Sequence, residues 1–363
     1  MEGIELGAPT YDTKTPDSDN ADSSNPERTS LEDKSCSFSD MVQQFMTSLL
    51  CELLRGISQV PLCGSLTAGV LCGLALAFAD LEVCALALLG CAAQTCMAHI
   101  CRLDAKSISE GTFGYNGVLI GCALATFCSL SFAWIALTTI LLGAASALLT
   151  ALLARLPVQF SFAFNLLTLV TLGTMSAATG RRVVPAEAGA LSWAGDFHLL
   201  SAGDWVESTL NGVAQMMFVR SPLSGVLVFL GCLYESPYGA FSVLGASLIG
   251  ALGGAFCGAP AAHVEAGLWG YNAALTVAWI SLCSLPTAAS IAFVCIGAVL
   301  ATALYAGLAW AFAAFPGLPC LSLPFCIASL LCFMLMIPMR WAKRPQSAEN
   351  AESAESAPPS SQV

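Results

Sequence analysis

The chain has 363 residues, of which 56% are hydrophobic and only 10% are charged, and its mean hydropathy is +0.75. A soluble globular domain is about 25% charged, so this composition excludes an ordinary soluble domain and indicates an integral membrane protein. The net charge is −11, and we expect membrane lipid, but no nucleic acid, among its partners.

The acidity lies mainly at the ends of the chain. Residues 1–40 hold ten acidic and three basic residues, and residues 341–363 are rich in Ala, Glu, Pro and Ser. Such segments lack the apolar residues that would offset the entropy of ordering, so we expect both tails to be disordered. The first apolar run begins only near residue 41, which is unlike a cleaved signal peptide, so we expect the acidic tail to remain.

Apolar runs follow in chain order, five in a first repeat at residues 41–178 and five in a second repeat at 201–340. A connector at residues 179–200 separates the two repeats. A helix that crosses a membrane needs about 20 apolar residues. We therefore expect crossings near residues 43–58, 62–79, 82–100, 131–153, 160–178, 208–219, 223–236, 238–257, 288–312 and 322–338.

A shorter segment interrupts this pattern in each repeat. FGYNGVL at residues 113–119 returns as WGYNAAL at 269–275. Each segment has a glycine two residues before it, Gly111 or Gly267, and carries a polar Asn, which favours a helix that enters the membrane only partway. Broken backbone at membrane depth is tolerated where protein or water satisfies it.

The two repeats share one offset. Asn272 follows Asn116, and Gln215 follows Gln59, by the same 156 residues, so one unit has been duplicated. Five crossings and one re-entrant segment per unit make the second copy inverted. The predicted fold is an all-α integral membrane protein of two inverted repeats, each with about five transmembrane helices and one re-entrant pore helix.

Glycines recur every four residues in one predicted crossing of the second repeat, at Gly250, Gly254 and Gly258. This spacing lets helices approach closely. We favour packing inside the chain over a contact between subunits.

Neutral polar side chains recur in both repeats. An ion pathway normally shows ionisable residues inside the spans, so these neutral groups favour a neutral passenger. Glutamines alternatively only fasten helices together by hydrogen bonds, and an Asn where a helix breaks is expected to cap free backbone groups. The recurring pairs are Gln59 with Gln215, Asn116 with Asn272, and Ser161 with Ser322.

Two further repeated pairs combine an aromatic and an aliphatic residue on one helical face. Tyr115 and Leu119 are four residues apart, as are Tyr271 and Leu275. Such a face is ordinarily core. Repetition about a two-fold axis also fits two facing plates that leave a narrow slot.

Cysteine and histidine usage gives no reactive centre. The 17 cysteines sit singly in apolar runs, which favours packing or lipid-facing roles over disulfides. His99, His198 and His263 lack the spacing of a metal site, and no nucleophile is paired with a base. We expect no metal, no cofactor and no enzymatic activity.

Five motifs together resemble the urea transporter family from about residue 41 to residue 339. They are RGISQV at residues 55–60, FGYNGVL, SPLSG at 221–225, GLWGYNAAL at 267–275 and LPCLSLPF at 318–325. The resemblance implies a multi-pass protein of the cell membrane, a homotrimer in which each subunit conducts urea passively through its own narrow pore between the repeats.

The resemblance also implies roles for single residues. Gln59 and Gln215 would be the polar groups at the two slot ends, and Ser161 and Ser322 the central hydroxyls. Asn116 and Asn272 would be structural residues of the pore. The implied slot walls are Leu62, Tyr115, Leu119, Phe218, Tyr271 and Leu275.

Three departures from the family pattern keep alternatives open. Leu62 stands where an aromatic wall is expected, serines replace both central threonines, and Ala163 replaces a proline. A wider first half would pass other small neutral amides, ammonia or water. A non-conducting packing protein is a further interpretation that the same departures allow.

Overall fold

The protein is described by a computed structural model that covers residues 38–156, 159–180, 200–314 and 317–337. The predicted disordered tails, most of the connector and His198 lie outside these residues. The chain divides into a unit of residues 1–43 and a unit of residues 44–363. The arrangement below is that of the second unit.

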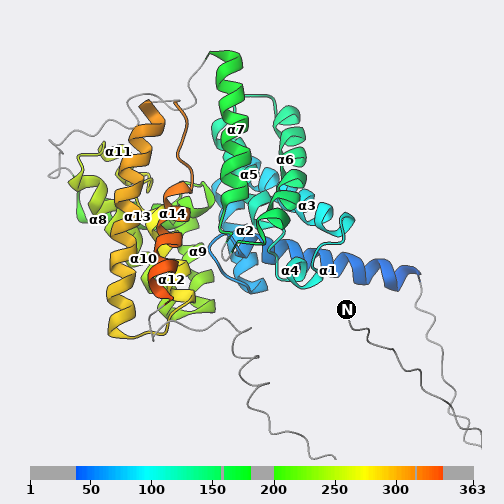
Figure 1. Cartoon of the computed structure of the whole chain (residues 1–363), viewed down its shortest axis with the longest axis horizontal. Coiled ribbons are helices and arrows are strands. Elements are labelled where there is room, and N and C mark those ends of the chain that lie inside the picture. The colour runs from blue at the N-terminus through cyan, green and yellow to red at the C-terminus, as the bar shows by residue number, and fades with distance from the viewer. Residues whose placement is uncertain (1–37, 157–158, 181–199, 315–316, 338–363) are drawn as a thin grey trace, which may run out of the picture. The chain divides into compact units, whose positions relative to one another are not determined.

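Helices joined by turns make up the described residues. The first half contains α1 (Phe38–Ser58), α2 (Leu66–Ala79), α3 (Leu81–Ile100), α4 (Ala105–Ser109), α5 (Tyr115–Phe127), α6 (Phe132–Leu153) and α7 (Phe162–Thr179). The second half contains α8 (Ala202–Ala214), the 3₁₀ helix η2 (Gln215–Met217), α9 (Pro222–Glu235), α10 (Pro237–Phe256), α11 (Ala261–Glu265), α12 (Tyr271–Leu282), α13 (Ala288–Ala314) and α14 (Leu323–Met336). Figure 1 colours the first half blue to green and the second yellow-green to red.

The local structure repeats with the offset found in the sequence. Helices α9, α10, α11 and α12 begin 156 residues after α2, α3, α4 and α5 respectively. Ser65 and Ser221 cap the N-termini of α2 and α9, each accepting a hydrogen bond from a backbone N–H three residues on. Just before these caps, Leu62 and Phe218 have left-handed φ angles of 63° and 62°. Because such angles are uncommon outside glycine, the same unusual turn is built twice.

Several helices are suited to a membrane. Among the described residues, α3, α6, α7, α10 and α13 have the length and apolar composition to cross one. A sixth candidate span is the pair formed by residues 202–217 and α9, which is bent by 70°. Helices α2, α5, α12 and α14 are apolar but shorter, with 12 to 14 residues, or about 18–21 Å at 1.5 Å per residue. The chain is therefore an all-helical, multi-pass membrane protein.

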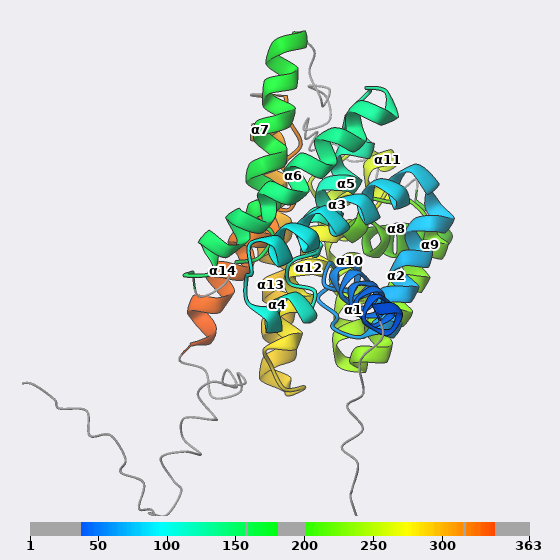
Figure 2. The same ribbon diagram turned by 90° about the vertical axis from the view of Figure 1, so that its right-hand side faces the viewer.

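The first predicted crossing, residues 43–58, forms most of α1 but is not among the helices suited to crossing. Gln44, Glu52 and Arg55 interrupt its apolar character. Residues 44–58 run crosswise to α7 and α13 in Figure 1 and are seen nearly end-on in Figure 2. The apolar character of α1 thus falls short of that of the crossing helices, and the predicted crossing at residues 43–58 is not supported.

Glycines bring α5 and α12 close to the long helices beside them. Gly90 of α3 and Gly117 of α5 face each other, and a Cβ on either would overlap the carbonyl oxygen of the other. In the second half, a Cβ on Gly250 would overlap the carbonyl oxygen of Trp269, and Gly254 lies against the Trp269 ring. The prediction that these two α10 glycines pack inside the chain is confirmed.

The halves meet where α2 lies beside α9 and where α7 lies beside α14. Ser224 of α9 donates a hydrogen bond from Oγ to the carbonyl oxygen of Ala75 in α2, at 2.7 Å. Gly231 of α9 lies against Ala68 of α2. Ala68 and Ser224 are equivalent positions, as are Ala75 and Gly231, so the two contacts are reciprocal. Reciprocal contacts are expected when two copies meet about a two-fold axis.

Candidate functional site

The two predicted glutamines occupy equivalent places after helices α1 and α8. Gln59 Nε2 donates a hydrogen bond to the carbonyl oxygen of Glu110 at 2.9 Å, and Gln215 Nε2 donates to that of Ala266 at 3.1 Å. A backbone carbonyl only accepts hydrogen bonds, so each amide must present its nitrogen to the backbone. Each Oε1 is then the acceptor that remains for another partner.

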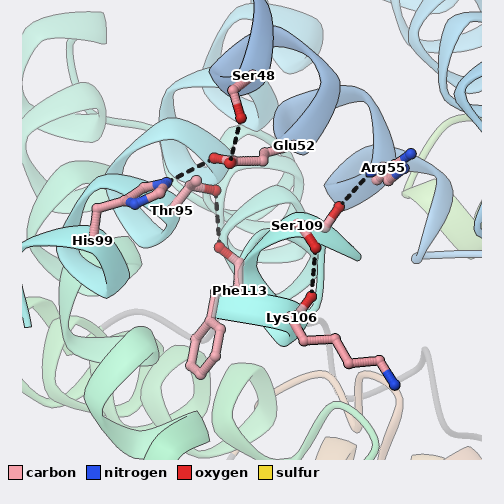
Figure 3. A network of polar contacts seen from close by, with 8 residues as sticks. All are labelled: Ser48, Glu52, Arg55, Thr95, His99, Lys106, Ser109 and Phe113. Atoms are coloured by element: carbon pink, nitrogen blue, oxygen red, sulfur yellow. Dashed lines mark hydrogen bonds and ion pairs between the residues drawn. The ribbon is translucent and has the colours of Figure 1, made fainter. Parts of the chain in front are cut away.

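A network of polar contacts holds the Gln59 end together (Figure 3). Glu52 of α1 is buried and lies 2.7 Å from Nε2 of His99 in α3. Arg55 donates to the carbonyl oxygen of Ser109 at 2.7 Å, and Thr95 Oγ1 donates to that of Phe113 at 2.9 Å. These contacts tie α1 and α3 to the segment that leads into α5.

The second half replaces the charged members of this network with neutral ones. Ser208 Oγ, equivalent to Glu52, donates to the carbonyl oxygen of Val264 at 2.6 Å. Asn211, equivalent to Arg55, donates to that of Glu265 at 2.8 Å. The two ends of the site thus share one backbone scheme but differ in charge.

The tyrosines hold the turns that lead to the predicted serines. Tyr115 donates from its hydroxyl to the carbonyl oxygen of Phe160, and Tyr271 donates to that of Leu321, both at 2.6 Å. Phe160 and Leu321 have left-handed φ angles of 41° and 49°. Each tyrosine therefore satisfies a carbonyl in a sharp turn immediately before Ser161 or Ser322.

The asparagines satisfy backbone groups where α7 and α14 begin. Asn116 Oδ1 accepts from the N–H of Phe164 at 3.2 Å, and Asn272 Oδ1 accepts from that of Phe325 at 3.1 Å. The first N–H groups of a helix have no partner within it, and these two find their partner in an asparagine side chain. Both asparagines are buried behind the tyrosines, at 0% and 1% exposure, and line no cavity described here.

The two serines touch each other. Ser161 Oγ and Ser322 Oγ are 2.6 Å apart, although the residues come from different halves of the chain. Each occupies the N-cap position of its helix, yet neither hydroxyl makes a capping hydrogen bond. The hydroxyls are therefore free to point inward, where both line a cavity.

That cavity has a volume of about 200 Å³ and is lined by residues of both halves. Every predicted slot residue lines it except Gln215, and no lining side chain among the described residues is charged. The lining is Gln59, Val60, Leu62, Thr112, Tyr115, Leu119, Gln159, Phe160, Ser161, Met216, Phe218, Tyr271, Leu275, Trp279, Ser322 and Phe325.

Gln215 lines a second cavity of about 420 Å³. Phe218 and Tyr271 line both cavities, so the two spaces adjoin at these residues. Arg220 and His263 also line the second cavity. Burial lowers the pKa of His263, so this imidazole is neutral near pH 7.

Aromatic rings form much of the wall. Phe218 packs edge-on against Phe127 and Phe164, with ring centroids 6.2 and 5.8 Å away. Leu62 supplies no ring, but Trp279 and Phe160 pack edge-on at 5.4 Å and both line the first cavity. Sequence reasoning missed Trp279, although it lies four residues after Leu275 on the same helical face. The other lining residues that sequence reasoning did not single out are Val60, Thr112, Gln159, Phe160, Met216 and Phe325. Val60 and Met216 follow the two glutamines at equivalent positions, so repetition could have indicated this pair.

No group of three His, Cys, Asp or Glu residues within the described ranges is placed to hold a metal ion. The cysteines of these ranges are free thiols. The site is thus a pair of adjoining cavities with aromatic and aliphatic walls. Gln59 and the two serines line the first cavity, and Gln215 lines the second.

Comparison with known proteins agrees with this architecture. Residues 50–337 match the family described as "Urea transporter". Urea transporter 1 of Ovis aries is 28% identical over 302 residues, which cover 78% of this chain and 76% of that protein. Urea transporter 1 of Rattus norvegicus is 26% identical over 312 residues, covering 81% and 78% respectively. The match extends over most of the chain and includes both halves, so the chain belongs to the urea transporter family.

Proposed function

We propose that the chain conducts urea passively, as a channel, along a path from Gln59 through the serine pair to Gln215. The observation that supports this most directly is the first cavity, which is lined by equivalent residues from both halves. Because the members of the family are transporters, the chain is a transporter and not an enzyme.

The chemistry of urea fits this path. Urea is flat and neutral, with N–H donors in its plane and one carbonyl acceptor. Its faces can lie between aromatic and aliphatic plates such as Tyr115, Leu119, Tyr271 and Leu275. Its edges can exchange water for amide, hydroxyl and backbone oxygens.

The uncharged walls of the first cavity make the entry of ions unfavourable. Desolvating a charge without a partner costs far more than desolvating an amide. The side chains that line the first cavity carry no charge. Ions are therefore excluded without a moving gate.

The proposal extends to the inversion of the two repeats, the re-entrant helices and the assembly of subunits. The repeats, residues 41–178 and 201–340, are inverted about an axis in the membrane plane, each with about five crossings and one re-entrant helix, α5 or α12. The reciprocal contacts between α2 and α9, and the meeting of equivalent serines, support a two-fold relation. The proposed assembly is a homotrimer in the cell membrane, as the family resemblance implies.

The test is stopped-flow urea uptake by vesicles that contain the purified chain. Leu275→Trp fills the slot and should reduce urea permeability by about tenfold or more, the effect of ~1.4 kcal/mol on the barrier. Leu335→Trp on α14 is the matched control, because that leucine is 53% exposed. It should conduct like the wild type.

Two results would contradict the proposal. Wild-type vesicles with no more urea permeability than empty ones would favour a non-conducting protein. Permeability to acetamide, ammonia or water equal to that for urea would favour the broader pore that Leu62 suggests.

A further inference from the structure

Asn165 lies one helical turn beyond Ser161 on α7 and is 1% exposed. Its Nδ2 is 2.8 Å from the carbonyl oxygen of Ser161 and 2.9 Å from Ser322 Oγ. It is also 3.3 Å from Ser161 Oγ. One side chain of the first half thus contacts both central serines without lining the cavity.

The contact with the Ser161 carbonyl fixes which way the amide points. An amide oxygen 2.8 Å from a carbonyl oxygen would repel it, whereas an NH₂ group donates to it. The second hydrogen of Nδ2 then points toward Ser322 Oγ. Ser322 must accept this hydrogen bond, so one of its lone pairs is committed.

Ser161 and Ser322 carry two hydroxyl protons between them. The 2.6 Å contact between Ser161 Oγ and Ser322 Oγ contains one hydroxyl proton. If Ser322 donates in this contact, the Ser161 proton is left for the cavity or for the Cys326 sulfur, a weak acceptor 3.4 Å from Ser161 Oγ. If Ser161 donates, the Ser322 proton is left for the cavity. With Asn165 in place, the serine pair therefore presents one donor and a restricted set of lone pairs to the cavity.

Asn165 has no counterpart in the second half. The equivalent position, four residues after Ser322, is Cys326. Within the described residues, Asn165 Oδ1 is buried and has no hydrogen-bond partner. A leucine would fill this space without leaving an unpaired oxygen, so packing alone does not account for an asparagine here.

We propose that Asn165 is a positioning residue that fixes the orientation of both central hydroxyls and thereby the preference of the pore for urea over other amides. It supplies the restraint that a threonine methyl would give at Ser161 and Ser322, because a β-branched side chain is confined at χ1 and serine is not. This inference rests on the proposed urea conduction.

The experiment compares urea and acetamide permeability, per reconstituted protein, in Asn165→Leu and the wild type. The urea-to-acetamide ratio should fall by about fivefold, the weight of one hydrogen bond between neutral groups. Thr168→Val is the matched control, because Thr168 is buried on the same helix and its Oγ1 has no partner among the described residues. Its ratio should not change.

A rescue variant separates positioning from packing. Ser161→Thr and Ser322→Thr, added to Asn165→Leu, should restore most of the ratio without restoring the amide. If Asn165→Leu fails to fold, Asn165→Cys, which copies the equivalent residue of the second half, carries the same test.

Either of two outcomes would overturn the inference. One is an unchanged ratio in the single variant, and the other is a lowered ratio that the threonines do not restore. Both differ from failure of the proposed function, in which the wild type itself conducts no urea.

Discussion

Trp279 is a wall residue that the first half lacks, since its equivalent there is Ala123. The indole packs against Phe160 and Phe333 and lines the first cavity, which Leu62 lines as well. Because residue 62 is not aromatic, the indole supplies a flat surface that this residue does not.

Replacing this indole should widen the slot. Trp279→Leu is expected to raise N-methylurea permeability relative to urea by about tenfold, because discrimination of one methyl group rests on a close wall. Adding Leu62→Phe should reverse the change by restoring a ring. Trp310→Leu, at a tryptophan that is 58% exposed, is the control, and stopped-flow uptake is the measurement. Equal selectivity in Trp279→Leu and the wild type would show that the indole is not a wall.

The sequence predicted those site residues that are duplicated. Gln59, Tyr115 and Ser161 have partners at equivalent places, and repetition distinguished them from ordinary core residues. The positions equivalent to Trp279 and Asn165 hold Ala123 and Cys326. Because these side chains occur in one half only, a comparison of the two halves gives no signal for them.

At the scale of elements, close backbone approach sets the position of α12. Gly250 lets α10 lie directly against the backbone at Trp269 and Gly270. Helix α12 begins at Tyr271 and carries Leu275 and Trp279, so an error in this approach would displace two wall residues.

A pair of glycine substitutions on α10 tests this packing. Gly250→Ala should lower the free energy of unfolding by roughly 1–3 kcal/mol, because its Cβ meets backbone that cannot yield. Gly245→Ala, with nothing within 4 Å of the added atom, should raise stability by up to about 1 kcal/mol. Thermal unfolding of the purified protein in detergent measures both. Similar shifts in the two variants would refute this account of the packing.

Apolar runs and the offset predicted the positions of most helices, but α1, α2 and α14 are not among the helices that are long and apolar enough to cross a membrane. Hydropathy alone treats a run such as FMTSLLCELL as buried in lipid. The structure pairs Glu52 with His99 and Arg55 with the carbonyl oxygen of Ser109. These partners are 47 and 54 residues away in the chain, so no local pattern reveals that the charges are satisfied.

At the scale of the whole molecule, the two halves form one path with no charged side chain in the lining of the first cavity. A transporter that couples to protons or sodium needs an acidic or other cation-binding group on the path. The basic side chains that line the second cavity are Arg220, which is itself a cation, and His263, whose pKa is lowered by burial. Urea permeability should therefore be equal for influx and efflux, and unchanged when proton and sodium gradients are imposed or collapsed. Light scattering of vesicles measures both directions, with Leu275→Trp as the blocked control. Accumulation of urea against its gradient would exclude a passive channel.

The left-handed turns at Leu62 and Phe218 limit how such a pore can diversify. At a φ near +62°, valine, isoleucine and threonine are strained by their branched Cβ, whereas glycine fits the backbone but leaves no wall. The large apolar residues that remain for these positions are those not branched at Cβ, such as leucine, methionine, phenylalanine and tyrosine. Substitutions at residues 62 and 218 can therefore change the width of the slot only by the large size differences among these side chains. Where one of these positions holds no aromatic ring, a ring on a neighbouring helix can supply the wall instead.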